Sequence, residues 1–114
     1  MAIDNPNVID GVAVDKDNDS LIMLLTDHFE WTQTGGEDIL SEYDHLMMIQ
    51  EKLNLYVSYF TSRQYEDTFP DCKVKSAVID VRFKYDISEN CEMFLQVVQN
   101  KLAEIDMQIK YTVG

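Results

Sequence analysis

The chain has 114 residues, of which 21 are acidic and 9 are basic, and its formal net charge is -12. This length suffices for one domain, residues 1–114, and an apolar fraction of 46% is typical of a globular protein with a packed core. The negative charge repels phosphate backbones and anionic lipids, so we expect no nucleic-acid or membrane binding. The same charge either attracts a basic partner or serves solubility alone, and of these two interpretations we favour solubility.

Nothing in the sequence suggests secretion or insertion into a membrane. The first residues, MAIDNPNVIDGV, lack the basic start and the apolar run of a signal peptide. No stretch approaches the roughly 18 consecutive apolar residues that a membrane span requires. We therefore expect a cytoplasmic protein in which Cys72 and Cys91 are reduced thiols.

Two aliphatic runs near the start of the chain predict a β-hairpin. Residues 8–14 (VIDGVAV) and 21–26 (LIMLLT) have strand composition, and the polar residues 15–20 (DKDNDS) separate them. The aspartates of this polar segment have the spacing of the first ligands in a calcium-binding loop. However, the loop glycine and the final glutamate are missing, so we favour a polar turn.

A long helix is predicted from about residue 38 to residue 61, after the Gly35-Gly36 break. Its apolar residues recur at helical spacing: Ile39, Tyr43, Leu46, Leu53, Val57 and Phe60. A second stripe makes the helix apolar well past one face: Met48, Ile49, Leu55, Tyr56 and Tyr59. This spare surface either binds a partner or is covered by the connection 62–73, which would bury Tyr59, Tyr65 and Phe69.

The second half of the chain predicts a strand, a helix and a last strand. Residues 77–85 alternate apolar and polar side chains, Ser88 stands where a helix N-cap belongs, and residues 108–113 alternate again. Apolar residues follow Ser88 at helical spacing: Cys91, Leu95, Val98, Leu102 and Ile105. The order β-β-α-β-α-β predicts an α+β fold, a two-layer sandwich of a four-stranded sheet with two helices on one face.

Both histidines of the chain follow an aspartate, in the pairs Asp27-His28 and Asp44-His45. Imidazole and carboxylate groups are ligands for zinc and iron and also act as acid–base pairs, so these four residues are the candidate metal site. Their spacing is not that of a known motif, because no two histidines lie one turn apart on a helix. The alternative is two local structural roles at the strand end and the helix start.

Motifs for covalent catalysis or cofactor binding are absent from the sequence. There is no G-x-S-x-G and no glycine-rich phosphate loop. Cys91, near a predicted helix start, falls on the buried stripe, which favours a core position over a reactive thiol. We expect no cofactor.

Five stretches of the sequence resemble a family of small uncharacterised bacterial proteins, a domain of unknown function. They are NVIDG (7–11), DHFEW (27–31), HLMMIQEKLN (45–54), FPD (69–71) and VIDVRFKY (78–85). The resemblance covers about the whole chain. It implies a single cytoplasmic α+β domain and carries no established catalytic residues.

Three functions are compatible with these observations. The first is a non-enzymatic protein-binding domain, in its most concrete form an immunity-like partner of a basic toxin, with Trp31, Tyr56, Tyr59 and Tyr65 as candidate binding residues. The second is a metal-dependent enzyme or sensor that uses His28, His45, Asp27 and Asp44. The third is a homodimer formed through the apolar helix surface.

Overall fold

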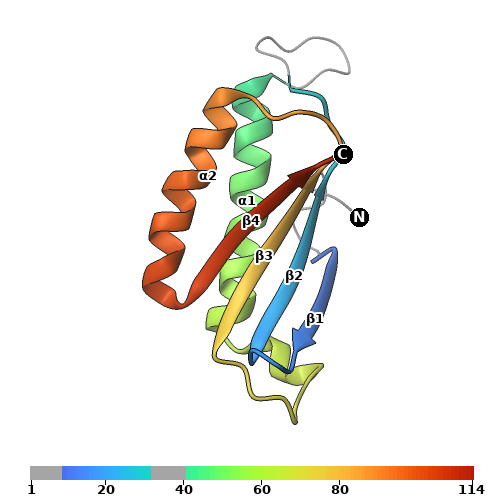
Figure 1. Ribbon diagram of the computed structural model, residues 1–114, viewed down its shortest axis with the longest axis vertical. Coiled ribbons are helices and arrows are strands. Elements are labelled where there is room, and N and C mark those ends of the chain that lie inside the picture. Colours follow the sequence, from blue (N-terminus) through green and yellow to red (C-terminus); the bar gives the residue numbers. More distant parts are fainter. Residues whose placement is uncertain (1–8, 32–40) are drawn as a thin grey trace.

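The protein is an α+β fold in which four strands and two helices follow one another in the predicted order (Figure 1). The computed structural model describes residues 9–31 and 41–114. The strands are β1 (Gly11–Asp15), β2 (Ser20–Asp27), β3 (Ser76–Phe83) and β4 (Met107–Val113). The helices are α1 (Glu42–Thr61) and α2 (Glu89–Leu102), with the short 3-10 helices η1 (Gln64–Asp67) and η2 (Ala103–Ile105).

The strands form one mixed sheet in the order β1-β2-β3-β4. β1 and β2 are antiparallel and form the predicted hairpin, with Asp15 paired to Ser20 next to the turn. β2 and β3 are parallel, as are β3 and β4. Parallel neighbours need a long crossover connection, and α1 and α2 supply the two that this sheet requires.

The core lies between the sheet and the helices, which cover one face of it (Figure 1). Alternate residues of β2 and β3 point into this layer because side chains of a strand alternate between its two faces. The innermost strand residues are Leu21, Met23, Leu25, Ala77, Ile79, Val81 and Phe83. Cys91 and Leu95 of α2 pack against them, which confirms the core position predicted for Cys91.

Serine caps start both helices. The Ser41 hydroxyl accepts a hydrogen bond from the Asp44 amide at 3.1 Å, and the Ser88 hydroxyl accepts one from the Cys91 amide at 3.2 Å. The N-cap role predicted for Ser88 is confirmed. The predicted start of the first helix, residues 38–40, and the Gly35-Gly36 break lie outside the described residues.

The connection after α1 folds back over that helix. Tyr65 of η1 is buried, with its ring centroid 6.0 Å from that of Phe60 and 6.5 Å from that of Tyr59. Phe69 is packed against the core in the same segment. Of the two interpretations of the spare apolar surface, intramolecular covering therefore holds for this part of the helix.

Candidate functional site

The face of α1 that packs on the sheet is unusually polar. Its five buried residues include His45, Lys52 and Tyr56 beside Ile49 and Leu53. Their spacing puts them on one side of the helix. The polar side chains meet the carboxyl-terminal half of β2 in two separate clusters.

The first cluster joins the end of β2 to the start of α1. Asp27 Oδ2 lies 2.6 Å from His45 Nε2, and both side chains are 0% exposed. Asp27 Oδ1 also accepts the Phe29 amide at 3.0 Å. Because a carboxylate can only accept in this pair, the His45 Nε2–H is the donor.

Trp31 stacks on the same imidazole. The two ring centroids are 3.6 Å apart and the planes differ by 13°, while Phe29 approaches His45 edge-on at 6.0 Å. His45 Nδ1 and Trp31 Nε1 are buried, and neither has a hydrogen-bond partner in the described part of the chain. A buried polar atom without a partner lowers the stability of the fold. The contacts that fix the imidazole are the hydrogen bond to Asp27 and the stacking on Trp31.

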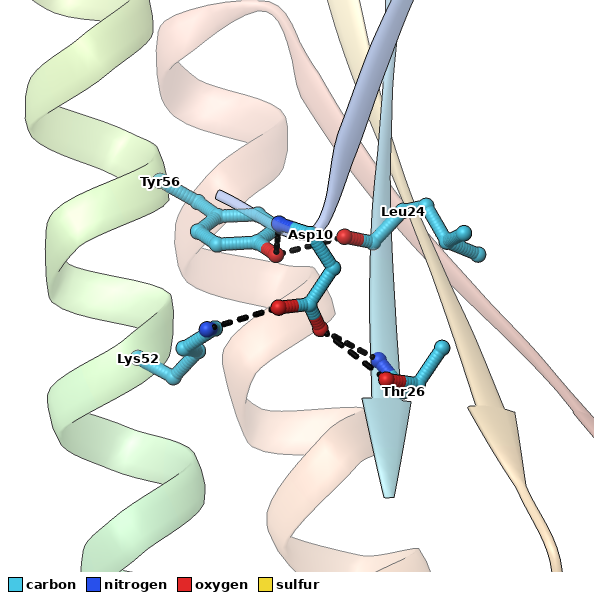
Figure 2. Close-up of polar contacts among 5 residues, drawn as sticks. All are labelled: Asp10, Leu24, Thr26, Lys52 and Tyr56. Carbon is cyan, nitrogen blue, oxygen red and sulfur yellow. Dashed lines mark hydrogen bonds and ion pairs between the residues drawn. The ribbon is translucent and has the colours of Figure 1, made fainter. Parts of the chain in front are cut away.

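The second cluster joins the residue before β1 to the middle of α1 (Figure 2). Asp10 Oδ1 lies 2.9 Å from Lys52 Nζ, with the Lys52 side chain 0% and the Asp10 side chain 3% exposed. Asp10 Oδ2 accepts from the Thr26 amide at 2.9 Å and from the Thr26 hydroxyl at 3.1 Å. The carboxylate therefore bridges a helix and a strand.

The Tyr56 hydroxyl completes this cluster. It donates to the Leu24 carbonyl and accepts from the Asp10 amide at 3.0 Å (Figure 2). Burial raises the pKa of Tyr56 well above that of an ordinary tyrosine, so the hydroxyl keeps its proton and remains a donor. Tyr56 and Asp10 thus form hydrogen bonds with the Leu24 carbonyl and the Thr26 amide of β2, next to the point where its pairing with β1 begins.

Both clusters connect α1 to β2 through buried hydrogen bonds. A general acid or base must reach its substrate within hydrogen-bonding distance. The side chains of Asp27, His45 and Lys52 are buried. Buried charges that satisfy one another fix how two elements pack, and this is the role that the geometry supports.

The structure brings together two of the four predicted metal ligands, and it does so across the two sequence pairs. Asp27 meets His45, whereas His28 and Asp44 are exposed. No group of three or more histidine, cysteine, aspartate or glutamate side chains is placed to hold a metal ion in residues 9–31 and 41–114. The residue set proposed from the sequence therefore does not converge on one point.

The four aromatic residues proposed for binding also have definite places. Tyr56 and Tyr65 are in the core, so neither offers a surface to a partner in this structure. Trp31 and Tyr59 are half-buried against the core. Other apolar side chains of α1 and α2 are exposed: Tyr43, Met47, Met93 and Val97.

The sequence interpretation missed Asp10 and Lys52. A signal was present, because Lys52 falls within the second apolar stripe of the helix, between Ile49 and Tyr56. Asp10 likewise interrupts the aliphatic run of residues 8–14. A charged residue on each of two buried faces predicts an opposite-charge pair, since an unpaired one would cost too much.

The model of one protein family matches this chain over residues 1–114. The chain belongs to DUF6572, a family of unknown function. No curated protein and no solved structure matches it. In this DUF6572 chain both buried clusters draw on the stretches that carried the resemblance, since these contain Asp10, Asp27, Trp31, His45 and Lys52.

The DUF6572 chain has a second feature of functional interest, on the solvent side of its helices. Four large apolar side chains are exposed there: Tyr43 and Met47 on α1, and Met93 and Val97 on α2. A groove of about 190 Å³ runs between the helices and is lined by Leu53 and Val57 of α1 and by Val97 of α2. None of the helices described is long and apolar enough to cross a membrane.

Proposed function

We propose that this domain binds a basic protein through the solvent-facing side of α1 and α2. Four exposed apolar side chains beside an open groove carry this proposal: Tyr43, Met47, Met93 and Val97, of which Tyr43 is 71%, Met93 58% and Val97 53% exposed. Large exposed apolar patches on small domains commonly mark interfaces, and aromatic residues and methionine are enriched there.

The two helices run side by side, so the apolar residues lie on one surface. Asn90 at the start of α2 donates to Glu42 at the start of α1 at 2.8 Å. By helical spacing, Tyr43 and Met47 continue the row of Gln50 and Asn54, which line the groove. A partner helix or loop lying in this groove would contact both helices at once.

The excess of acidic over basic residues on the two helices favours a basic partner. On α1 the charged residues other than the buried Lys52 are acidic: Glu42, Asp44 and Glu51. α2 begins with Glu89 and Glu92, and its one basic residue, Lys101, lies in its last turn, where it lines the groove. Acidic residues around apolar anchors speed the encounter with a cationic protein and disfavour acidic competitors. An immunity-like protein that caps a basic toxin is the most concrete form of this function.

The test compares Val97→Lys with Thr112→Lys, which puts the same charge on an exposed residue of β4 whose side chain faces away from the helices. Each protein is used to capture partners from native lysate, and captured proteins are identified by mass spectrometry and then purified. We expect a basic partner that loses about tenfold or more in affinity with Val97→Lys and little with Thr112→Lys. Equal binding to both variants, or a set of acidic partners, would contradict the proposal.

A further inference from the structure

We propose that the outer edge of β4, with the hollow between β4 and α2, is a binding site for an extended basic segment, which adds to the sheet as a fifth strand. This site lies on a different surface from the helix groove and goes beyond the function proposed above. Three observations support it: backbone amides of β4 point outward, the Gln99 side chain accepts a hydrogen bond from one of them, and Glu92 lines the hollow.

β4 ends the sheet on the side of α2 (Figure 1). Its one strand neighbour among the described residues is β3. The Gly114 amide donates to the Phe83 carbonyl of β3, so even-numbered amides face β3. Successive amides of a strand alternate in direction, and the amides of Ile109, Tyr111 and Val113 therefore face outward.

Gln99 of α2 shows how this edge is used. Its side-chain carbonyl oxygen, Oε1, accepts the outward Ile109 amide at 2.8 Å. A backbone carbonyl of an added strand would occupy the same kind of position. The next outward amides, on Tyr111 and Val113, belong to residues that are 40% and 42% exposed. An unpaired edge of this type is a template for strand addition.

The hollow beside the edge has room for side chains of the added strand. Its volume is about 310 Å³, and Leu95, Ile109 and Tyr111 give it an apolar wall. Among the described residues that line it, Glu92 is the charged one. Every second side chain of an added strand would point into this space, on the same side of the sheet as Ile109 and Tyr111.

The lining determines the chemistry of the ligand. A lysine or arginine in the added strand would pack its aliphatic stem on the apolar wall and place its charge at Glu92. β-branched residues would suit the alternate positions, because they favour the extended conformation. The occupant is therefore an extended segment of another protein that places a lysine or arginine beside Glu92.

The experiment uses a display library of seven-residue segments that alternate lysine or arginine with valine, isoleucine or threonine. A matched library carries glutamate in place of the basic residues. The key variant is Tyr111→Pro, which removes an outward amide and leaves pairing with β3 intact, as proline is tolerated where the amide faces solvent. Tyr111→Ala is its control, because it removes the side chain and keeps the amide. Should Tyr111→Pro fail to fold by circular dichroism, Val113→Pro removes the next outward amide.

We expect the basic library, and not the acidic one, to yield binders. Tyr111→Pro should weaken the best binder about tenfold relative to Tyr111→Ala, and Glu92→Gln should weaken it several-fold, by about threefold to fivefold. Gln99→Ala should strengthen binding because it frees the Ile109 amide. Val97→Lys should leave it unchanged, which separates this site from the helix groove.

Three results would overturn the assignment. One is a failure of the basic library to yield any binder. Another is binding that Tyr111→Pro and Tyr111→Ala reduce equally, which would place the ligand on the side chain and not on the strand edge. The third is a concentration-dependent dimer that Tyr111→Pro dissociates, which would make a second copy of this chain the occupant of the edge.

Discussion

Asp27 and His45 form one buried hydrogen bond of 2.6 Å, although in sequence Asp27 is next to His28 and His45 is next to Asp44. His45→Leu should leave the Asp27 carboxylate buried and without its ring partner. We expect the free energy of unfolding to fall by about 3–5 kcal/mol in urea denaturation followed by circular dichroism. The double variant Asp27→Asn/His45→Leu should be more stable than His45→Leu. A double variant that is less stable would contradict this interpretation.

Lys52 is the buried cation of the second cluster, and its replacement by methionine keeps the length of the side chain. Lys52→Met should destabilise the protein by about 3–5 kcal/mol because Asp10 then remains charged in a buried place. Adding Asp10→Asn should recover part of this loss. Lys73→Met, at an exposed residue, is the control and should change stability by less than about 0.5 kcal/mol. Similar losses for the two lysine variants would show that the pair does not hold α1 to β2.

The contribution of Cys91 to the free energy of unfolding should decrease at alkaline pH. Burial, with the negative charges of Asp27 and Glu42, raises the pKa of its thiol to about 12. Above the ordinary pKa, near 9, the unfolded chain releases this proton while the folded chain keeps it. Between these two pKa values the contribution of Cys91 to stability should therefore fall by about 1.4 kcal/mol per pH unit.

The measurement compares the wild type with Cys91→Ala in urea at about pH 8, 9, 10 and 11, which spans the ordinary titration range of a thiol. As the pH rises, the unfolding free energy of the wild type should fall relative to that of Cys91→Ala. A difference that is independent of pH would contradict the raised pKa. At about pH 8 the half-buried Cys72 should react with iodoacetamide well before the buried Cys91.

The Ser88 hydroxyl caps α2 through the Cys91 amide. Ser88→Ala should therefore cost about 1 kcal/mol, and Ser88→Gly only a few tenths, because glycine exposes the amide to water. Ser58→Ala, at an exposed position inside α1, controls for the loss of a serine and should not destabilise the protein. Thermal unfolding resolves these differences. Equal effects of Ser88→Ala and Ser58→Ala would exclude the cap.

The helices and strands were predictable because their apolar residues follow the geometry of each element. β3 is the clearest case, with Ala77, Ile79, Val81 and Phe83 at every second position and all buried. Its predicted end at residue 85 was two residues too late, since Lys84 and Tyr85 continue the alternation in sequence but are exposed after the strand. Sequence period alone does not show where pairing with a neighbouring strand ends.

The polar clusters were less predictable because their partners are distant in sequence. Asp27 and His45 are 18 positions apart, and Asp10 and Lys52 are 42 apart. Local reasoning paired each histidine with its neighbouring aspartate, but in β2 adjacent side chains alternate between the two faces, and Asp27 points to the helix side. Tyr56 was a candidate for a surface because helical spacing does not reveal which side of a broad apolar helix meets the sheet.

The parallel pairing of β2 and β3 also constrains the order of folding. Ser20 and Ser76 are partners in this register and are 56 positions apart. The β1–β2 hairpin closes over a short turn and can form early, whereas the centre of the sheet must wait for a contact that closes a much longer loop. During synthesis the inner edge of β2 therefore emerges, and stays without its strand partner, until the whole of α1 and β3 has left the ribosome.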